Sequence, residues 1–522
     1  MAGSTRRDHY LWRLVLLVLS RAIHSTSTEA ADYSVIVVGA GMAGVTAARA
    51  LTDAGITSVL VLEARDRVGG RTYSVNTSTA GTIDLGAMWI HGAEKGNPLY
   101  DLAVERNEPM SRLIDYGTSE VFDQNGEPLS MPSEWIRTYI DMGNFTLGIE
   151  EYQASHDQNP LDYPDISLYE LYTSTTKNLP EEQRPMANLQ LNVYYQVLLN
   201  GNVTNLSTLR YGDAKTLPAL DVFLFNGFDA LVKMQTPGLE ILLSTPVVSV
   251  DQRVEDEPVK VTTADGTVYT AHHVVTTETL GCLKAGNIKY IPPLPAPKEE
   301  AIRNGLGMGV FDKAILVYNE SYWADTDFIM QTMETMSGLW KLYLNYDSVM
   351  KKPVLVALNV AETARGLEKQ TDEEVLRELM VSLRVLYPAI PDPNEFYLTR
   401  WYEDPWSRGA YSYFAVGNEK NVTKVIGETV GRVYFAGEAA SDKPGTVLGA
   451  YLSGLDTASR IAESVSRSPL DVDGRGGRTP GDEGGTGDGA RADKSSNGSY
   501  APGYRVGALF VVVYVLLFSV LW

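Results

Sequence analysis

Three glycines and one acid are the first residues whose types and spacing can do chemistry. Gly39, Gly41 and Gly44 follow the spacing G-x-G-x-x-G, and Glu63 lies about 20 residues further along. In such a group the first glycine permits a tight turn, the second lets the backbone approach a pyrophosphate, and the third lets a helix pack closely. An acid at the position of Glu63 accepts hydrogen bonds from a ribose hydroxyl and disfavours a 2′-phosphate. The group therefore predicts a dinucleotide site.

The elements that must position these glycines can also be predicted. Residues 35–38 and 59–62 are short apolar runs, typical of buried parallel strands. A helix over 45–54, between them, would direct its N-terminus at the bound anion. A glycine-rich turn in an ordinary α/β protein is the alternative. Strand, glycines, helix, strand and acid nevertheless occur here in the required order.

The run RDRVGGRT over 65–72 indicates which dinucleotide is bound. Gly69 and Gly70 allow a second close approach of the backbone, and Arg71 supplies a permanent forked cation. The run resembles the pattern of flavoprotein amine oxidases, in which the two glycines and the arginine lie against the diphosphate and the flavin. The resemblance implies FAD rather than NAD.

Further segments extend the resemblance over nearly the whole body of the chain. They are DLGAMWIHG (84–92), VFLFNGFDALV (222–232), LGCLKAGNIKYIPPLP (280–295), FDKAILVY (311–318) and YFAGEAASDKPGTVLGAYLSG (434–454). These segments are similar to the polyamine oxidase branch of the flavin amine oxidases. The resemblance implies the amine oxidase fold, with a Rossmann-like FAD-binding domain assembled from separate pieces of the chain.

The resemblance also implies a set of FAD contacts. Glu438 corresponds to the acid that accepts hydrogen bonds from the ribityl chain, and Val247 to the residue whose backbone meets the adenine. Thr446 and Val447 correspond to the run beneath the isoalloxazine. The full predicted set is Gly39, Ala40, Gly41, Met42, Ala43, Gly44, Glu63, Ala64, Arg65, Gly70, Arg71, Gly86, Ala87, Met88, Trp89, Val247, Glu438, Thr446 and Val447.

Two residues are predicted to be catalytic. Lys313 matches the family lysine that holds a water near flavin N5, and a desolvated lysine can take part in proton transfer. His91 matches the active-site histidine of animal and yeast polyamine and spermine oxidases, where plant apoplastic enzymes tend to have a glutamate. An outward-pointing strand residue and a satisfied structural histidine are the respective alternatives.

Aromatic residues are predicted to bind the substrate. In WSRGAYSYF (406–414), Ala410 occupies the place of the flavin-linking cysteine of monoamine oxidases, so the resemblance implies FAD bound without a covalent bond. Tyr411 and Tyr451 would form two walls of an aromatic cage, which suits the methylenes and cationic nitrogens of an amine. Trp89 and Trp401 are predicted to join them. Ordinary core packing is the alternative.

The composition of the chain limits which classes of partner and which kinds of site are expected. The formal net charge of −21 makes nucleic acid an unlikely partner and attracts polycations, although generic solubility explains the charge equally well. Cys282 is the only cysteine, so no internal disulfide or thiolate metal site can form, and its apolar neighbours predict a buried side chain. No cluster has the spacing of metal ligands.

The two ends of the chain resemble targeting segments. Residues 1–31 have the form of a secretory signal, and 506–522 are apolar and end the sequence. A glycolipid-anchor signal is the favoured interpretation of the tail, and a retained tail anchor is the alternative. Between the body and the tail, 467–505 are predicted to be a disordered stalk. N-glycosylation sequons begin at Asn76, Asn144, Asn202, Asn205, Asn319, Asn421 and Asn497.

The alternation of strand and helix signals predicts an α/β protein, α+β overall, with two domains. The FAD-binding domain is predicted to comprise 32–95, 221–285 and 401–466. The substrate domain, of mixed sheet and helix, would comprise 96–220 and 286–400.

The predicted activity is FAD-dependent oxidation of polyamines, whether spermine, spermidine or acetylated forms, with O2 reduced to H2O2. A monoamine or L-amino-acid oxidase of the same fold is one alternative, and a non-catalytic flavin scaffold at the cell surface is another. A nuclear histone demethylase is disfavoured by the apparent secretory signal and the sequons. No membrane contact is predicted beyond the tail or its glycolipid replacement.

Overall fold

The computed structural model describes residues 32–115, 117–129, 133–213, 220–255, 257–336 and 338–467. The predicted signal segment, the anchor tail and all but the first residue of the stalk lie outside these residues, as does Asn497. Within the described residues, no helix is both long and apolar enough to cross a membrane.

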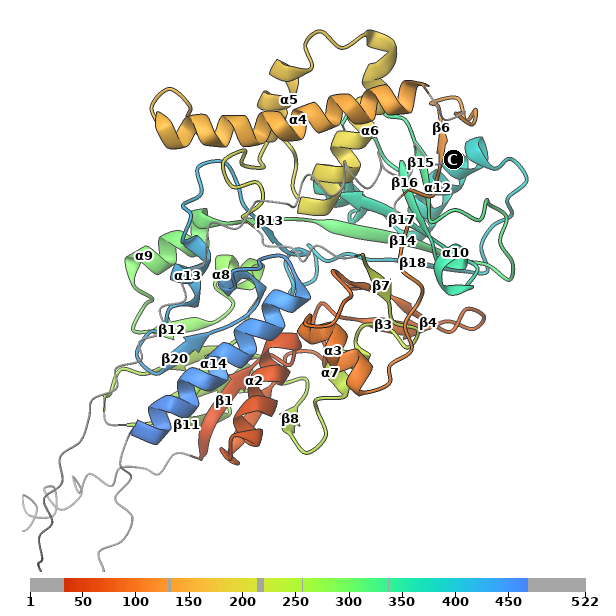
Figure 1. Ribbon diagram of the computed structural model, residues 1–522. Coiled ribbons are helices and arrows are strands. Elements are labelled where there is room, and N and C mark those ends of the chain that lie inside the picture. Colours follow the sequence, from red (N-terminus) through yellow and green to blue (C-terminus); the bar gives the residue numbers. More distant parts are fainter. Residues whose placement is uncertain are drawn as a thin grey trace, which may run out of the picture.

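The first large sheet has eight strands, and it gathers pieces from both ends and the middle of the chain (Figure 1). Its strands are β1 (Tyr33–Val38), β2 (Val59–Leu62), β8 (Glu240–Leu242), β9 (Val247–Asp251), β10 (Val259–Thr263), β11 (Val268–Thr276), β12 (Lys289–Ile291) and β20 (Val433–Phe435). β1 runs parallel to β2 and to β11, which is itself parallel to β20. The last four residues of β1 and all of β2 are buried, because helices or strands cover both faces of this part of the sheet.

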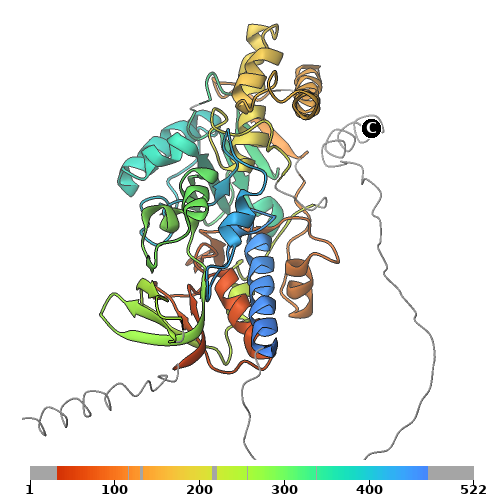
Figure 2. The ribbon, with the colours of Figure 1, turned by 90° about the vertical axis from the view of Figure 1, so that its left-hand side faces the viewer.

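Two helices cover one face of this sheet. α2 (Met42–Asp53) and α14 (Val447–Arg467) lie side by side in both views (Figures 1 and 2). Gly454 of α14 approaches the backbone of α2 so closely that a Cβ atom there would lie 2.4 Å from the carbonyl oxygen of Ala43. The two predicted strands are confirmed, and the predicted helix begins three residues early, at Met42, because the third glycine of the motif is already helical.

The second large sheet has six strands in the order β18-β14-β17-β16-β15-β6. They are β6 (Ser119–Phe122), β14 (Phe311–Val317), β15 (Phe328–Gln331), β16 (Leu342–Asn345), β17 (Val354–Val360) and β18 (Glu395–Leu398). One face packs on α12 (Asp372–Leu386), through side chains that include Leu316 and Leu379. The other face packs on α6 (Arg184–Leu191) and on residues near β5 and β7, through Ile315 and Leu189 among others.

The remaining elements are short or lie at the periphery. They are β3 (Ser74–Asn76), β4 (Thr82–Asp84), β5 (Trp89–Ile90), α3 (Pro98–Glu105), α4 (Ser133–Gln158), α5 (Leu168–Thr175), η1 (Glu181–Gln183), η2 (Asn192–Val197), β7 (Val222–Phe223), α7 (Ala230–Lys233), α8 (Leu280–Ala285), α9 (Ala296–Glu300), η3 (Ala301–Gly305), β13 (Gly307–Met308), α10 (Tyr346–Met350), α11 (Ala361–Leu367), β19 (Ser412–Tyr413), α13 (Val422–Gly427) and η4 (Glu438–Ala440). β12 pairs with β9 in the first sheet, although residues 286–400 are predicted to belong to the substrate domain. The domain boundaries themselves stay a prediction.

Candidate active site

The glycine turn after β1 is closely packed on two sides and open on a third. Gly39 has φ +101°, and a Cβ atom on Gly44 would lie 1.9 Å from the Gly39 carbonyl oxygen, so these two positions require glycine. At Gly41 the nearest atom to such a Cβ would be the Gly69 carbonyl oxygen, 4.0 Å away. The middle glycine therefore faces open space, at the N-terminus of α2, where a phosphate group can approach the backbone.

Glu63, at the end of β2, holds this turn in place. Its Oε2 accepts a hydrogen bond from the Ala40 amide at 2.6 Å, and its Oε1 accepts one from the Arg65 amide at 2.8 Å. A carboxylate oxygen can accept more than one hydrogen bond, so Glu63 can also serve a ribose hydroxyl. The Arg65 guanidinium pairs instead with Asp404, at 2.7 and 2.8 Å, so the side chain of this predicted FAD contact is already engaged.

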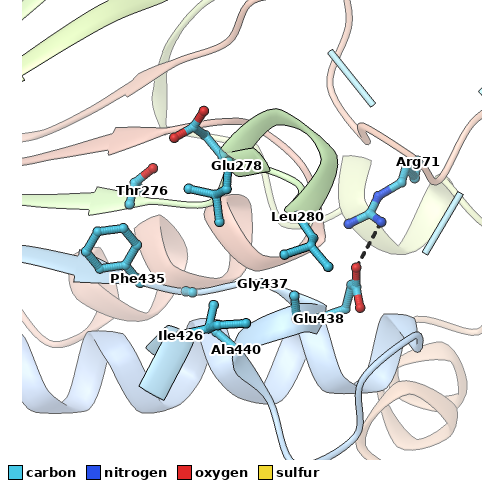
Figure 3. Close-up of a pocket in the computed structure, with 12 residues that line it drawn as sticks. Arg71, Thr276, Glu278, Leu280, Ile426, Phe435, Gly437, Glu438 and Ala440 are labelled. Atoms are coloured by element: carbon cyan, nitrogen blue, oxygen red, sulfur yellow. Dashed lines mark hydrogen bonds and ion pairs between the residues drawn. The ribbon is translucent and has the colours of Figure 1, made fainter. Parts of the chain in front are cut away.

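Arg71 and Glu438 form a second polar group, at the edge of a cavity (Figure 3). An Arg71 nitrogen lies 3.0 Å from Glu438 Oε1 and donates to the Ala410 carbonyl at 2.8 Å. Glu438 Oε2 also accepts from the Gly445 amide at 2.8 Å. Arg71 can meet a diphosphate and Glu438 a hydroxyl, so together with the open glycine turn and Glu63 the donor and acceptor set fits FAD.

Glu278, on the opposite side of the same cavity, is absent from the predicted set (Figure 3). Its Oε2 accepts from the Tyr290 hydroxyl at 2.6 Å, whereas its Oε1 is buried and makes no hydrogen bond with the described part of the chain. Burial raises the pKa of Glu278 to about 7. No local pattern marks this glutamate, because Tyr290 and several of the residues that line its cavity come from other segments of the chain.

Lys313, the third residue of β14, is buried, so the alternative of an outward-pointing strand residue is wrong. Its Nζ donates to the carbonyl oxygens of Asp84, at 3.1 Å, and Gly86. An ammonium has three N–H groups, so one donor remains for a water or a ligand. Burial lowers the pKa of Lys313, and the nearby Asp84 carboxylate partly opposes that effect.

Gly86 also connects the surroundings of Lys313 with the segment that carries Arg71. A Cβ atom at Gly86 would lie 2.0 Å from the Arg71 carbonyl oxygen, which also accepts a hydrogen bond from the Ala87 amide at 3.1 Å. The segment that receives the Lys313 ammonium is thus packed directly against the segment that carries Arg71. Met88, two residues after Gly86, is buried in the core that also holds Ile315 and Leu189, and its sulfur accepts a weak hydrogen bond from the Tyr346 hydroxyl.

His91 stands in a relay of three side chains. Trp89 Nε1 donates to His91 Nε2 at 2.7 Å, and His91 Nδ1 lies 2.9 Å from Asp221 Oδ2. The geometry assigns the neutral tautomer with its proton on Nδ1, and both ring nitrogens are engaged. Asp221 also accepts from the Gly92 amide at 3.1 Å. Sequence reasoning missed Asp221, which lies far from His91 along the chain.

The predicted aromatic residues fall into separate groups. Tyr411 is half-buried, its ring centroid is 6.1 Å from that of Phe311, and its hydroxyl donates to the Val197 carbonyl at 3.3 Å. Tyr451 lies on α14 and packs against the core cluster of α2. Trp89 makes an edge contact with Phe223, at 5.7 Å between centroids.

Helix α14 begins close to Tyr411. A Cβ atom on Gly445 would lie 3.1 Å from the Tyr411 ring, and Thr446 Oγ1 accepts from the Gly449 amide at 2.9 Å as a helix cap. The predicted contacts Thr446 and Val447 thus place a positive helix end close to Tyr411 and Glu438. Val247, the predicted adenine contact, begins β9 and is buried. Within the described residues, no group of His, Cys, Asp and Glu side chains is arranged to hold a metal ion.

Comparison with known proteins gives concordant matches. The family model described as flavin containing amine oxidoreductase matches residues 42–462. Polyamine oxidase 2 of Arabidopsis thaliana is 32% identical over 441 residues, which cover 81% of this chain and 87% of the relative. Lysine-specific histone demethylase 2 of Homo sapiens is 32% identical over 459 residues, covering 82% of this chain but 53% of that protein. A solved structure of a putrescine oxidase triple mutant with redesigned cofactor binding superposes with a TM-score of 0.69 at 22% identity, covering 84% of this chain and 99% of the other.

Proposed function

Because the chain belongs to the flavin containing amine oxidoreductase family, a family of FAD-dependent enzymes, we propose that it oxidises polyamines. The predicted family, amine oxidase fold and cofactor are confirmed by the comparisons. The proposed substrates are spermine, spermidine or their acetylated forms. The products would be an aldehyde, an amine and hydrogen peroxide.

One observation carries the proposal. The buried Lys313 ammonium is held by the carbonyls of Asp84 and Gly86, and the segment of Gly86 packs directly on the one that carries Arg71. What bound FAD supplies is removal of a hydride from the carbon next to an amine nitrogen and transfer of two electrons to dioxygen. Lys313, with one N–H left over, would hold a water beside the reacting carbon. The substrate imine then takes up water and releases the aldehyde.

The surroundings of Lys313 favour an extended amine. Tyr411 and Phe311 offer apolar ring faces for methylene groups. The net charge of −21 attracts cationic substrates over longer distances. Because both ring nitrogens of His91 are engaged, this residue would act by positioning Trp89 and would contact the amine only if Trp89 Nε1 moved away.

The test is anaerobic mixing of the FAD-loaded protein with spermine while the visible flavin band is followed. Rapid bleaching supports the proposal. A protein that stays oxidised with spermine, spermidine and their acetyl forms but bleaches with a monoamine or an L-amino acid would support the rival oxidases. A protein that no amine bleaches would support the non-catalytic scaffold.

We also propose that the protein is secreted or held at the cell surface by a glycolipid anchor, with N-linked glycans. In support, the side chains of Asn76, Asn144, Asn205, Asn319 and Asn421 are exposed. Expression of the full chain in cells with a secretory pathway, followed by glycan mass spectrometry and phospholipase treatment, tests this. An unglycosylated protein retained inside the cell would contradict it.

A further inference from the structure

The face of β14 opposite Lys313 carries a buried acid. Side chains alternate along a strand, so Asp312 points with Ala314 and Leu316 toward the core beneath α12, whereas Lys313 points the other way with Ile315. Asp312 is fully buried. Because an isolated buried carboxylate is costly, the partners of this side chain decide its state.

Only one of the two oxygens of Asp312 receives hydrogen bonds. Oδ1 accepts from the Thr399 hydroxyl at 2.8 Å and from the Trp401 amide at 3.3 Å. Oδ2 is buried and receives no hydrogen bond from the described residues. Asn359 faces Asp312 in the strand register, but its amide nitrogen makes no hydrogen bond with the described chain either.

A second buried carboxyl group, that of Glu368 directly after α11, is held by the same short segment, because Asp312 accepts from the Trp401 amide and Glu368 from the next two amides of the chain. The Glu368 side chain is almost fully buried, and its own oxygens are both occupied. Oε1 accepts from the Tyr402 amide at 2.8 Å and Oε2 from the Glu403 amide at 2.7 Å. After burial, the nearby Glu368 is the main cause that raises the pKa of Asp312 well above its ordinary value. Two carboxyl groups this close cannot both be ionised without a large cost.

We propose that Asp312 carries a proton on Oδ2 and donates it to Glu368, so that the pair clamps residues 399–403 against the strand that holds Lys313. The proton belongs on Asp312 because both oxygens of Glu368 already accept backbone N–H groups. The clamp reaches the site through short links, since Thr399 Oγ1 also accepts from the Lys313 amide at 2.8 Å. Asp312 and Glu368 are thus positioning residues for Lys313 and Trp401, an inference that rests on the proposed function.

The predicted proton makes two conservative substitutions unequal. Asp312→Asn keeps an oxygen for Thr399 and Trp401 and supplies an N–H to Glu368, so it mimics the protonated acid. Glu368→Gln forces an NH2 group against the Tyr402 or Glu403 amide. We expect Asp312→Asn to reduce flavin within about threefold of the wild-type rate and Glu368→Gln to be slower by about tenfold or more, the cost of one mismatched buried hydrogen bond. The Kd for spermine should change by a smaller factor than the rate of flavin reduction.

The experiment compares these variants as full-length, FAD-loaded proteins. Glu395→Gln, which removes a carboxylate from the end of β18, is the matched control and should leave the rate unchanged. The reverse order, with Asp312→Asn slow and Glu368→Gln near wild type, would overturn the proton assignment. Two near-wild-type variants would overturn the clamp.

Infrared spectroscopy tests the proton without a substitution and without turnover. Above about pH 9 both Asp84, whose pKa burial raises to about 6, and Glu278, whose pKa burial raises to about 7, are ionised. Labelling the side-chain carboxyl of aspartate with ¹³C should therefore shift a protonated-carboxyl band, and labelling that of glutamate should not. If no amine reduces the flavin, the proposed function fails while this band still reports the clamp. An unshifted band overturns the inference whatever the activity.

Discussion

The dinucleotide cradle and the region around Lys313 use polar groups in different ways. The cradle, formed by Gly39 to Gly44 and Glu63, lies within one strand–turn–helix–strand unit, in which Glu63 accepts from the Ala40 amide of the turn and from the Arg65 amide just after β2. In the region of Lys313 and His91, important polar side chains depend on partners from other parts of the chain. Examples are Lys313 with the Gly86 carbonyl, and His91 with Asp221. Local backbone geometry thus determines the cradle, whereas tertiary packing determines the region around Lys313.

The largest expected effect is loss of the cradle itself. Gly44→Ala places a Cβ atom 1.9 Å from the Gly39 carbonyl oxygen, a contact that only a shift of the turn can relieve. We expect the variant to purify without FAD, as measured by the ratio of flavin to protein absorbance. Gly366→Ala, where a Cβ atom would meet nothing within 4 Å, is the control. Full FAD content in Gly44→Ala would show that the turn is not closely packed.

The second largest effect is expected from replacing the buried Lys313. Lys313→Met should retain FAD but lower the rate of anaerobic flavin reduction by about 100-fold or more, the range expected for loss of a proton-transfer or water-positioning group. Lys352→Met is a matched control, because Lys352 is also buried and held by two carbonyls, those of Thr82 and Phe225. Equal losses in both variants would mean that loss of any buried lysine near this sheet has the same effect.

A smaller effect is expected from the relay at His91. In Asp221→Asn a single oxygen must serve both the His91 ring and the Gly92 amide, and an NH2 group takes the other place. The Nδ1–H tautomer of His91 is then no longer selected, so the contact between His91 and Trp89 weakens. We expect KM for spermine to rise about tenfold while the limiting rate of flavin reduction changes less. Asp213→Asn, which breaks an ion pair with Arg210, is the control. A fall in the limiting rate with unchanged KM would place His91 in the chemical step instead.

The last prediction concerns the pH dependence of stability, near the cradle, and leaves the rate of catalysis aside. Burial raises the pKa of Glu278 to about 7, above the ordinary value of 4.5. The folded protein therefore holds an extra proton between these values, and its unfolding free energy falls as pH rises from about 4.5 to 7. Glu278→Gln carries no charge, so it should gain stability relative to wild type by up to about 3 kcal/mol at pH 8 and nothing below pH 4.5. Thermal unfolding at both pH values measures this, and a pH-independent difference would contradict it.

Particular residues show why prediction succeeded in one region and was incomplete in the other. The strands around the glycine turn were predictable because a short apolar run and its turn residues lie within one segment. Asp221 and Glu278 could not be predicted, because the local sequence around a single acidic residue does not show whether it is exposed in a loop or buried beside a partner. Lys313 could be singled out because a lysine is unusual among apolar strand residues, but its two carbonyl acceptors could not.

The sequence by itself determined the dinucleotide turn, the choice of flavin and the family, because these depend on spacings within short segments. Only the tertiary structure decided which nitrogen of His91 carries the proton, what holds the Lys313 ammonium, and that Asp312 faces Glu368. These properties depend on distances between atoms from remote segments. Such distances exist only after the two sheets have closed on one another, and burial then shifts the pKa values of Lys313 and Asp312.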